Sequence, residues 1–259
     1  MTDSHVHIGQ YEDRYYDPLE IMDVVISAGM EGVSFSSTSS CIDCILYPEI
    51  EKEIVSFLSH ISYTAEIIRP FFWYIPDYIK KNIVIESAFD SIPYKGIKIH
   101  PFAHNWDFDD LRHMEALHDL FDYAGENNLP VLIHTGCNGV DNANRFERFI
   151  NEYRNVKCTL AHCRPINTTI EMLKKYTNAY CDTSFTSKTN IQRIISAGFK
   201  DRIILGSDFP ITYFFRTKYP GIGENTMISM CEQYTEDIDG WKEWVTALSC
   251  IEEITKDIK

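Results

Sequence analysis

The sequence lacks the long apolar runs from which membrane-spanning helices are built. No stretch of its 259 residues approaches the ~20 consecutive apolar residues that such a helix needs. Strand-like sequence begins at residue 2, so we expect no signal peptide and a cytoplasmic protein. Low-complexity segments and clear interdomain linkers are also missing. We therefore expect residues 1–259 to form a single domain.

Basic residues are few and form no long run. The chain has 24 lysines and arginines against 38 aspartates and glutamates, which gives a net charge of −14. Because nucleic-acid surfaces need clustered basic side chains for phosphate contacts, we expect no nucleic-acid partner. A small-molecule substrate with an anionic group, held by one or two arginines, remains compatible with this balance. The sequence leaves the oligomeric state open, a homo-oligomer included.

Paired cysteine motifs are almost absent. Of the eight cysteines, only Cys41 and Cys44 have the two-residue spacing of a zinc or redox pair. No second pair exists to complete a four-cysteine zinc site. We therefore expect reduced core thiols, as in cytosolic proteins, and assign no role to Cys41 and Cys44.

The chain does contain a regular alternation of strand and helix signals. Hydrophobic residues make up 44% and aromatic residues 13%, enough for a large core. Short apolar runs predict eight strands, near residues 2–8, 31–37, 68–75, 96–100, 129–134, 156–162, 178–183 and 202–207. Helical stretches connect them, for example 18–29, 109–127 and 168–176.

Eight strand–helix units in about 250 residues predict an α/β protein with a (β/α)8 TIM barrel. A doubly wound open sheet is the alternative, because alternation alone does not distinguish an open sheet from a closed one. The last strand leads into an acidic region, for which we expect a helical C-terminal extension from about residue 224.

The most informative motif is His5-Val6-His7, which stands in DSHVHIG at residues 3–9. Residues two apart on a strand share a face, so Asp3, His5 and His7 are expected on one side. Two imidazoles ~7 Å apart along the backbone can converge on one metal ion. The neighbouring carboxylate can act as a ligand or can hold one ring by its second nitrogen.

Further ionisable residues end the later strands. In a parallel barrel the catalytic residues lie at the C-terminal strand ends. Burying an ionisable group there costs several kcal/mol unless it is paired or bound to metal, so packing does not explain such residues. They are Lys98 and His100 in GIKIHP, His134 in LPVLIHTG, His162 in LAHC and Asp208 in GSDFP.

Together these motifs resemble the amidohydrolase superfamily of metal-dependent TIM-barrel enzymes, specifically its amidohydrolase-2 branch. The resemblance runs from Asp3 to Pro210, through DSHVHIG, GIKIHP, LPVLIHTG, LAHC, YCDTSF and GSDFP. It implies that His5 and His7 bind the more buried metal. It also implies that Asp208 completes this site while acting on the bound water.

The resemblance leaves the number of metals open. In one-metal members His134 joins the first ion, and His162 orients the nucleophile or the substrate. In two-metal members both histidines bind a second ion, bridged by a strand-four glutamate or carbamylated lysine. Lys98 lies on that strand, where it could bridge metals, contact substrate or stay an ordinary lysine. We prefer one ion; three imidazoles and a carboxylate suit zinc, with manganese, iron or cobalt as alternatives.

The resulting prediction is a hydrolase for an amide, lactone or ester bond of a small molecule. The metal lowers the pKa of a bound water to about 7. Asp208 takes up and redelivers the proton, while the metal or His162 polarises the carbonyl.

Non-hydrolytic, metal-dependent decarboxylation of an unsaturated or aromatic acid is the alternative within the same branch. A TatD-type nuclease and a barrel that binds metal without turnover rank lower, because strand four lacks a glutamate and no expected ligand is missing.

The loops after the strands hold further candidates for the pocket mouth. We assign His100 and Arg164 to substrate binding, since a guanidinium there can clamp a carboxylate. Roles remain open, between pocket contact and ordinary packing, capping or ion pairing, for His104, Asp182, Arg216, Trp73 and Tyr74. Helical positions favour surface or packing roles for His60, His113 and His118.

Overall fold

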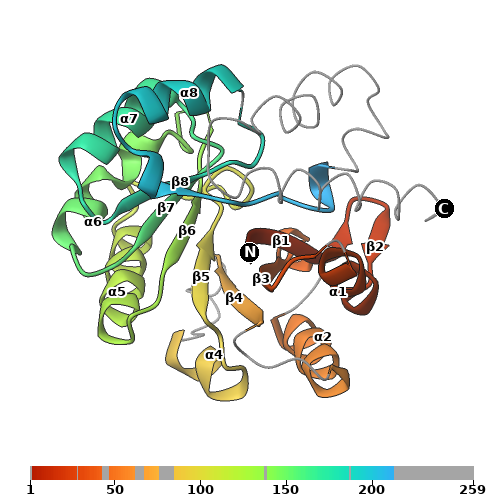
Figure 1. Ribbon diagram of the computed structural model, residues 1–259. Helices are drawn as coiled ribbons and strands as arrows, with labels where there is room; N and C mark the ends of the chain where they lie inside the picture. Colours follow the sequence, from red (N-terminus) through yellow and green to blue (C-terminus); the bar gives the residue numbers. More distant parts are fainter. Residues whose placement is uncertain are drawn as a thin grey trace.

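The computed structural model describes residues 2–27, 29–42, 47–61, 67–75, 85–136, 139–186 and 188–212. They form a curved nine-stranded sheet in the order β2-β1-β3-β4-β5-β6-β7-β8-β9 (Figure 1). Only β1 and β2 pair antiparallel; every other neighbouring pair is parallel. The strands are β1 (Thr2–Tyr11), β2 (Arg14–Tyr16), β3 (Gly32–Ser37), β4 (Ile68–Tyr74), β5 (Gly96–Ile99), β6 (Val131–His134), β7 (Cys158–Ala161), β8 (Ala179–Asp182) and β9 (Ile203–Ile204).

Helices follow each of the first seven parallel strands and cover the outside of the sheet (Figure 1). They are α1 (Pro18–Ser27), α2 (Tyr47–His60), α4 (Ile85–Ser91), α5 (Leu111–Glu126), α6 (Glu147–Glu152), α7 (Ile166–Lys175) and α8 (Lys188–Ser196), with short 3-10 helices at η1 (Thr38–Cys41), η2 (Ala143–Phe146) and η3 (Lys200–Arg202). The eight predicted parallel strands and their helical connections are therefore confirmed. The hairpin strand β2 was not foreseen.

The sheet closes on itself through the segment that follows β9, residues 205–209. The backbone N–H groups of Ser4 and His7 donate to carbonyl groups of this segment at 3.0 and 2.7 Å. In return, the N–H of Asp208 donates to the carbonyl of His5 at 2.7 Å. An open sheet makes no such bonds between its first and last parallel strands. The (β/α)8 barrel is confirmed, and the doubly wound alternative is wrong.

A buried carboxylate, Asp3, reinforces this closure. It accepts hydrogen bonds from the hydroxyl and backbone N–H of Ser207, at 2.5 and 3.0 Å, and from the N–H of His5 at 3.2 Å. Burial raises the pKa of Asp3 to about 7, although these hydrogen bonds act in the opposite direction. A register shift between Asp3 and Val6 interrupts the strand alternation. Asp3 therefore joins β1 to the segment that carries Asp208 and holds no imidazole ring.

Replacing Asp3 with alanine should destabilise the barrel by about 2–4 kcal/mol, because three buried donors then lose their acceptor. Urea unfolding midpoints of the two proteins measure this difference. Asp3→Asn is the matched control; it keeps an amide oxygen as acceptor and should lose less. An Asp3→Ala protein as stable as the wild type would show that these bonds do not hold the closure.

Helix α5 illustrates how the sequence places the outer layer. Asp110 caps its first turn by accepting from the backbone N–H of Arg112 at 2.9 Å. Its apolar stripe is buried from Leu117 to Ala124. Leu111, by contrast, is 76% exposed. It is the first helical residue, and the packed stripe begins one turn later.

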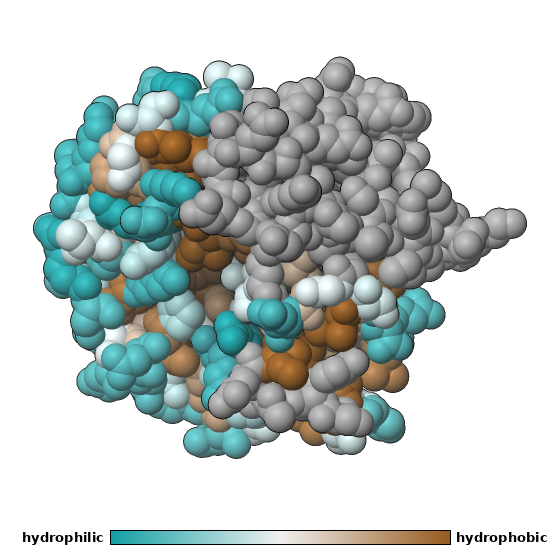
Figure 2. All heavy atoms as spheres, in the orientation of Figure 1, coloured by the Kyte–Doolittle hydropathy of each residue, from teal (hydrophilic) through white to brown (hydrophobic). Residues whose placement is uncertain are grey.

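The outer surface of the molecule is mainly polar over the helices. Figure 2 shows hydrophilic residues, in teal, over the outer helices and apolar residues, in brown, toward the centre. Among the helices that the structure describes, none is long and apolar enough to cross a bilayer. The extension expected from about residue 224, as well as Arg216 and Cys44, lies outside the described residues.

Candidate active site

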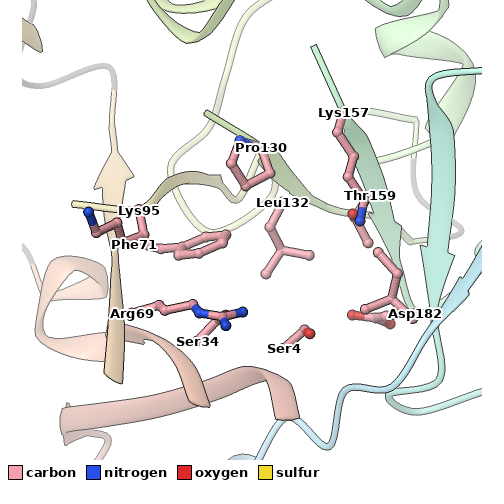
Figure 3. A pocket seen from close by; sticks show the side chains of 11 residues that line it. Ser4, Ser34, Arg69, Phe71, Lys95, Pro130, Leu132, Lys157, Thr159 and Asp182 are labelled. Atoms are coloured by element: carbon pink, nitrogen blue, oxygen red, sulfur yellow. The ribbon is translucent and has the colours of Figure 1, made fainter. Parts of the chain in front are cut away.

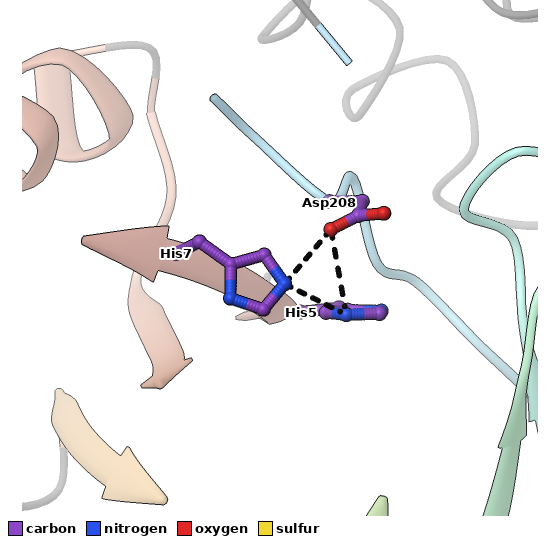
Figure 4. Close-up of side chains that lie close together, drawn as sticks. All are labelled: His5, His7 and Asp208. Atoms are coloured by element: carbon purple, nitrogen blue, oxygen red, sulfur yellow. Dashed lines mark hydrogen bonds and ion pairs between the residues drawn. The ribbon is translucent and has the colours of Figure 1, made fainter. Parts of the chain in front are cut away.

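Three side chains from the closing edge of the barrel converge on one point (Figure 4). His5 and His7 extend from β1, and Asp208 lies in the segment after β9. The Nε2 atoms of the two histidines are 3.2 Å apart. Asp208 Oδ1 lies 2.9 Å from His7 Nε2 and 3.5 Å from His5 Nε2. All three residues are buried, with 1%, 4% and 5% of their surfaces exposed.

The hydrogen bonds of the two rings determine which nitrogens carry protons. His5 Nδ1 lies 2.7 Å from a carboxylate oxygen of Asp182, and His7 Nδ1 lies 3.2 Å from the carbonyl of Ser36. Both partners are acceptors, so both Nδ1 atoms donate and both Nε2 atoms present lone pairs. Within the described chain, Asp208 Oδ1 makes no hydrogen bond. Two lone pairs and a carboxylate oxygen at this spacing are a donor set that fits a divalent cation.

Charge at this cluster also favours an ionised carboxylate. Burial opposes ionisation, but His5, His7 and Lys98 together keep the pKa of Asp208 below its usual value. The backbone of Asp208 lies in the left-handed region, with φ of 56°. Such a conformation costs energy for a residue other than glycine, and here the closing hydrogen bonds hold it in place.

Gly206 allows β1 to approach this closely. A Cβ at position 206 would lie 2.8 Å from His5 Cβ, shorter than real carbon contacts. The structure shows that the space is occupied by His5, so glycine is needed for the closing segment and the ligand strand to meet.

Asp182, at the end of β8, accepts hydrogen bonds from two of the histidines. One carboxylate oxygen accepts from His5 Nδ1; the other accepts from the backbone N–H of His162 at 2.9 Å and from the Ser184 hydroxyl at 2.7 Å. Burial raises the pKa of Asp182 to about 7, while the bonds from His162 and Ser184 lower it. The sequence left this residue's role open; its contacts now make it the residue that orients His5.

Asp182→Asn should weaken metal binding about 10–100-fold, because an amide oxygen satisfies only part of this network and His5 loses its orientation. Competition with a metallochromic chelator measures the affinity. The control is Asp119→Asn, which changes an exposed aspartate of α5. Equal affinities for the Asp182→Asn and wild-type proteins would mean that Asp182 does not position a ligand.

His134 and His162 lie beside the cluster without joining it. Among the described residues, the group whose ligand atoms all lie within 4.8 Å of one another contains only His5, His7 and Asp208. His162 Nδ1 faces the Ser184 carbonyl at 3.2 Å, so its Nε2 accepts from His134 Nδ1 at 3.0 Å. The second nitrogen of His134, Nε2, then carries a lone pair. Its assignment as a ligand stays a prediction.

A stack of rings continues from His134 along the cavity wall. His134 lies on His100 with ring centroids 3.6 Å apart, and His100 lies parallel to Trp73 at 5.9 Å. Burial lowers the pKa of His100, His134 and His162 well below the usual value, so all three are neutral. His100 Nδ1 accepts from the N–H of Ala103 at 3.1 Å. Its proton is therefore on Nε2, as a donor.

Lys98 is 1% exposed, and its ammonium lies 3.1 Å from His5 Nε2. Burial lowers the pKa of Lys98 to about 8, while the carboxylates of Asp208 and Asp182 act in the opposite direction. The lysine thus faces the metal cluster from β5. Whether it bridges metals or contacts substrate stays open.

These groups border a cavity of about 500 Å³. Of the predicted residues, it is lined by His5, His7, Lys98, His100, His134, His162, Arg164, Asp208 and Trp73. The sequence did not point to its remaining walls, Tyr11, Thr38, Cys41, Phe102, Ala103, Phe185 and Ile211. Most of them follow a strand end in sequence, which is the one signal that could have identified them.

The remaining candidates have packing roles. Tyr74 packs against Trp106, with ring centroids 5.9 Å apart, and His104 lies edge-on to Trp73. His60 is exposed on α2, and His118 contacts Tyr153. His113, in α5, accepts from the backbone N–H of Asp107 at 3.0 Å. The helical histidines thus have the surface and packing roles expected of them.

Comparison with known families decides the classification. Residues 83–228, more than half of the chain, match the family model described as amidohydrolase, in the amidohydrolase-2 branch. The chain belongs to this family. The amidohydrolase-2 family is part of a broad superfamily of metal-dependent hydrolases and decarboxylases. No curated protein sequence matches the chain.

Solved structures show the same fold at low sequence identity. An uncharacterised TIM-barrel protein from Bordetella bronchiseptica is 13% identical, with a TM-score of 0.63 over 99% of this chain and 98% of that one. An amidohydrolase II is 12% identical, with a TM-score of 0.59 over 97% and 99%. The 5-carboxyvanillate decarboxylase of Sphingomonas paucimobilis is 12% identical, with a TM-score of 0.56 over 98% and 97%. These likenesses support the barrel and leave the reaction open.

Proposed function

We propose that this amidohydrolase-2 protein is a metal-dependent hydrolase that cleaves an amide, lactone or ester bond of a small molecule. The observation that carries the proposal is the convergence of two imidazole lone pairs and an ionised carboxylate at the wall of a 500 Å³ cavity. A cavity of this volume is in the range for small-molecule substrates. The proposed ligands are His5, His7 and Asp208, with His134 completing the set and zinc as the preferred ion.

A divalent cation held there would act as a Lewis acid and make a water molecule nucleophilic near neutral pH. Asp208 is the proposed base. Asp208 lines the cavity, and its second oxygen, Oδ2, lies 3.9 Å from His162 Nε2. The carboxylate can take the water proton and later deliver it to the leaving group.

The cavity wall supplies groups that can orient a substrate. The His100 Nε2–H donor is held by the ring stack and suits a substrate oxygen. One terminal nitrogen of Arg164 donates to the Phe185 carbonyl at 3.0 Å, which anchors the guanidinium at the mouth. The rest of its donor face suits a substrate carboxylate. Aromatic walls from Trp73 and Phe185 favour a substrate with a flat apolar body.

His162→Asn should lower kcat by about 100-fold or more and leave the first equivalent of metal bound. His162 lies beside Asp208 and outside the three-residue cluster, so it serves the reacting groups rather than the ion. Elemental analysis and turnover have to be measured on the same preparation. Loss of the first metal equivalent in this variant would show that His162 is a ligand instead.

Decarboxylation of an unsaturated or aromatic acid is the second candidate. The anchored Arg164 and the aromatic walls suit such an acid as well. A screen of small amides, lactones, esters and aromatic acids, followed by product analysis in ¹⁸O-labelled water, separates the two. Hydrolysis incorporates ¹⁸O into the product, whereas decarboxylation releases carbon dioxide without such incorporation. Turnover of acids alone, with carbon dioxide release, would overturn the hydrolase proposal.

A further inference from the structure

One buried hydroxyl group connects the two sides of the candidate active site. Ser184 lies in the turn after β8 and is completely buried. Its Oγ lies 2.7 Å from Asp182 Oδ1, 2.9 Å from His162 Nδ1 and 3.2 Å from His5 Nδ1. A single side chain thus contacts a candidate metal ligand, the carboxylate that orients this ligand, and the histidine beside the proposed base.

Three donors make Asp182 Oδ1 an acceptor. The backbone N–H groups of His162 and Ser184 point to this oxygen at 2.9 and 3.2 Å, and such groups can only donate. The Ser184 hydroxyl therefore donates its single proton to the same oxygen. Asp182 also borders a smaller cavity, of about 160 Å³, at the beginnings of the strands (Figure 3). The hydrogen-bonded group accordingly lies between that cavity and the active site.

The direction of this hydrogen bond determines which nitrogen of His162 carries the proton. Because its own proton goes to Asp182, Ser184 Oγ offers only lone pairs to the imidazole, and His162 Nδ1 has to donate. The Ser184 carbonyl is a second acceptor for this nitrogen at 3.2 Å, but it also accepts from Thr186 Oγ1 at 3.0 Å. The hydroxyl is the closer acceptor, and the lone pair of His162 is left on Nε2.

The Nε2 lone pair is directed toward the reacting groups. His162 Nε2 lies 3.0 Å from His134 Nδ1 and 3.9 Å from Asp208 Oδ2, and all three residues line the active-site cavity. The opposite tautomer would present an N–H group at this position, and it could not accept a proton there. A chain of hydrogen bonds that ends on a carboxylate also makes the imidazole more basic.

We infer that Ser184 is a positioning residue, which holds the proton of His162 on Nδ1 and keeps Nε2 available to the reacting groups. Its bond to Asp182 ties this arrangement to the carboxylate that also holds His5. The catalytic consequence rests on the proposed function, because the lone pair matters only where a proton moves. The position of the proton itself depends on no activity.

The tautomer of His162 can therefore be measured without a substrate. Long-range ¹H–¹⁵N correlation spectra of ¹⁵N-histidine-labelled protein, loaded with one equivalent of zinc, show which ring nitrogen is protonated, and His162→Asn assigns the signals. The wild type should carry the proton on Nδ1. Ser184→Ala should raise the ratio of the Nε2–H to the Nδ1–H form at least about fivefold, because one hydrogen bond of about 1 kcal/mol is lost. The matched control is Ser56→Ala, which changes an exposed serine of α2 and should leave the ratio unchanged.

Turnover and metal content separate positioning from a purely structural role. Ser184→Ala should lower kcat about tenfold or more at an unchanged KM and retain its zinc, whereas Asp182→Asn weakens metal binding. Zinc loss in proportion to the loss of turnover would mean that Ser184 only supports the metal ligand, which overturns the inference. A folded Ser184→Ala protein with the wild-type tautomer ratio overturns it as well.

A second variant keeps the test decisive if circular dichroism shows that Ser184→Ala is unfolded. Ser184→Cys fills the same space with a weaker acceptor and should shift the tautomer ratio in the same direction. An unchanged ratio in this variant would then contradict the inference. Failure to find any turnover of the wild type contradicts the proposed function instead, and the tautomer ratio still decides the role of Ser184.

Discussion

Replacing His7 with alanine should remove the metal site almost completely. His7 supplies one of the two imidazole lone pairs, and Asp208 Oδ1 lies closer to it than to His5. The expected loss of affinity exceeds the about 10–100-fold typical of residues that only support a ligand. The ring is buried beside the barrel closure, so water replaces it poorly as a ligand.

The measurement is metal content after dialysis against a weak chelator, with competition titrations for the residual affinity. His60→Ala is the matched control, because His60 is exposed at the end of α2 and does not belong to the cluster. Both variants should unfold at nearly the same denaturant concentration when metal is absent. If the His7→Ala protein retains a full equivalent at wild-type affinity, the cluster in Figure 4 is not the metal site.

Asp208→Asn should lower kcat at least about 100-fold on whichever substrate the screen identifies. Asparagine keeps the shape of the side chain and one ligand oxygen but accepts no proton. General-base catalysis contributes typically about 10²–10⁴-fold, which sets the expected scale. The neighbours that keep Asp208 ionised, His5, His7 and Lys98, remain in the variant.

Because an amide oxygen is also a weaker ligand, turnover has to be expressed per bound metal. The comparison variant is Asp182→Asn, which perturbs the same network from the side of His5 without touching the proposed base. A metal-replete Asp208→Asn protein with near wild-type turnover would leave Asp208 a structural ligand only. His162 would then be the better candidate for the base.

The strand ends could be predicted because topology alone brings them together. In a barrel of parallel strands, residues that end different strands meet at one mouth, however far apart they lie in sequence. His5 and Asp208 are the clearest example, since they are about 200 residues apart in sequence and joined by the barrel closure. The alternation of strand and helix signals along the chain was sufficient for this step.

The sequence pattern did not predict the role of Asp3. Period-two alternation placed Asp3 on the face of His5 and His7, but the register shift between Asp3 and Val6 breaks the period. Asp3 therefore accepts from Ser207, whereas His5 lines the active-site cavity. Local irregularities of this kind depend on pairing with strands distant in sequence, so no local pattern reveals them.

The supporting contacts were also not predictable. Asp182 ends β8 in the same way that other ionisable residues end their strands, so no sequence pattern separates a ligand from the residue that orients one. Only the 2.7 Å contact with His5 Nδ1 makes that distinction. Similarly, only the structure shows that Gly206 makes room for His5.

The central claim is that His5, His7 and Asp208 hold a divalent metal ion. Elemental analysis of the purified protein, after reconstitution and removal of loosely bound ions, tests it most directly. We predict about one equivalent of a single transition metal per chain, zinc in preference to manganese, iron or cobalt. Less than about a tenth of an equivalent of every transition metal after reconstitution would contradict the account.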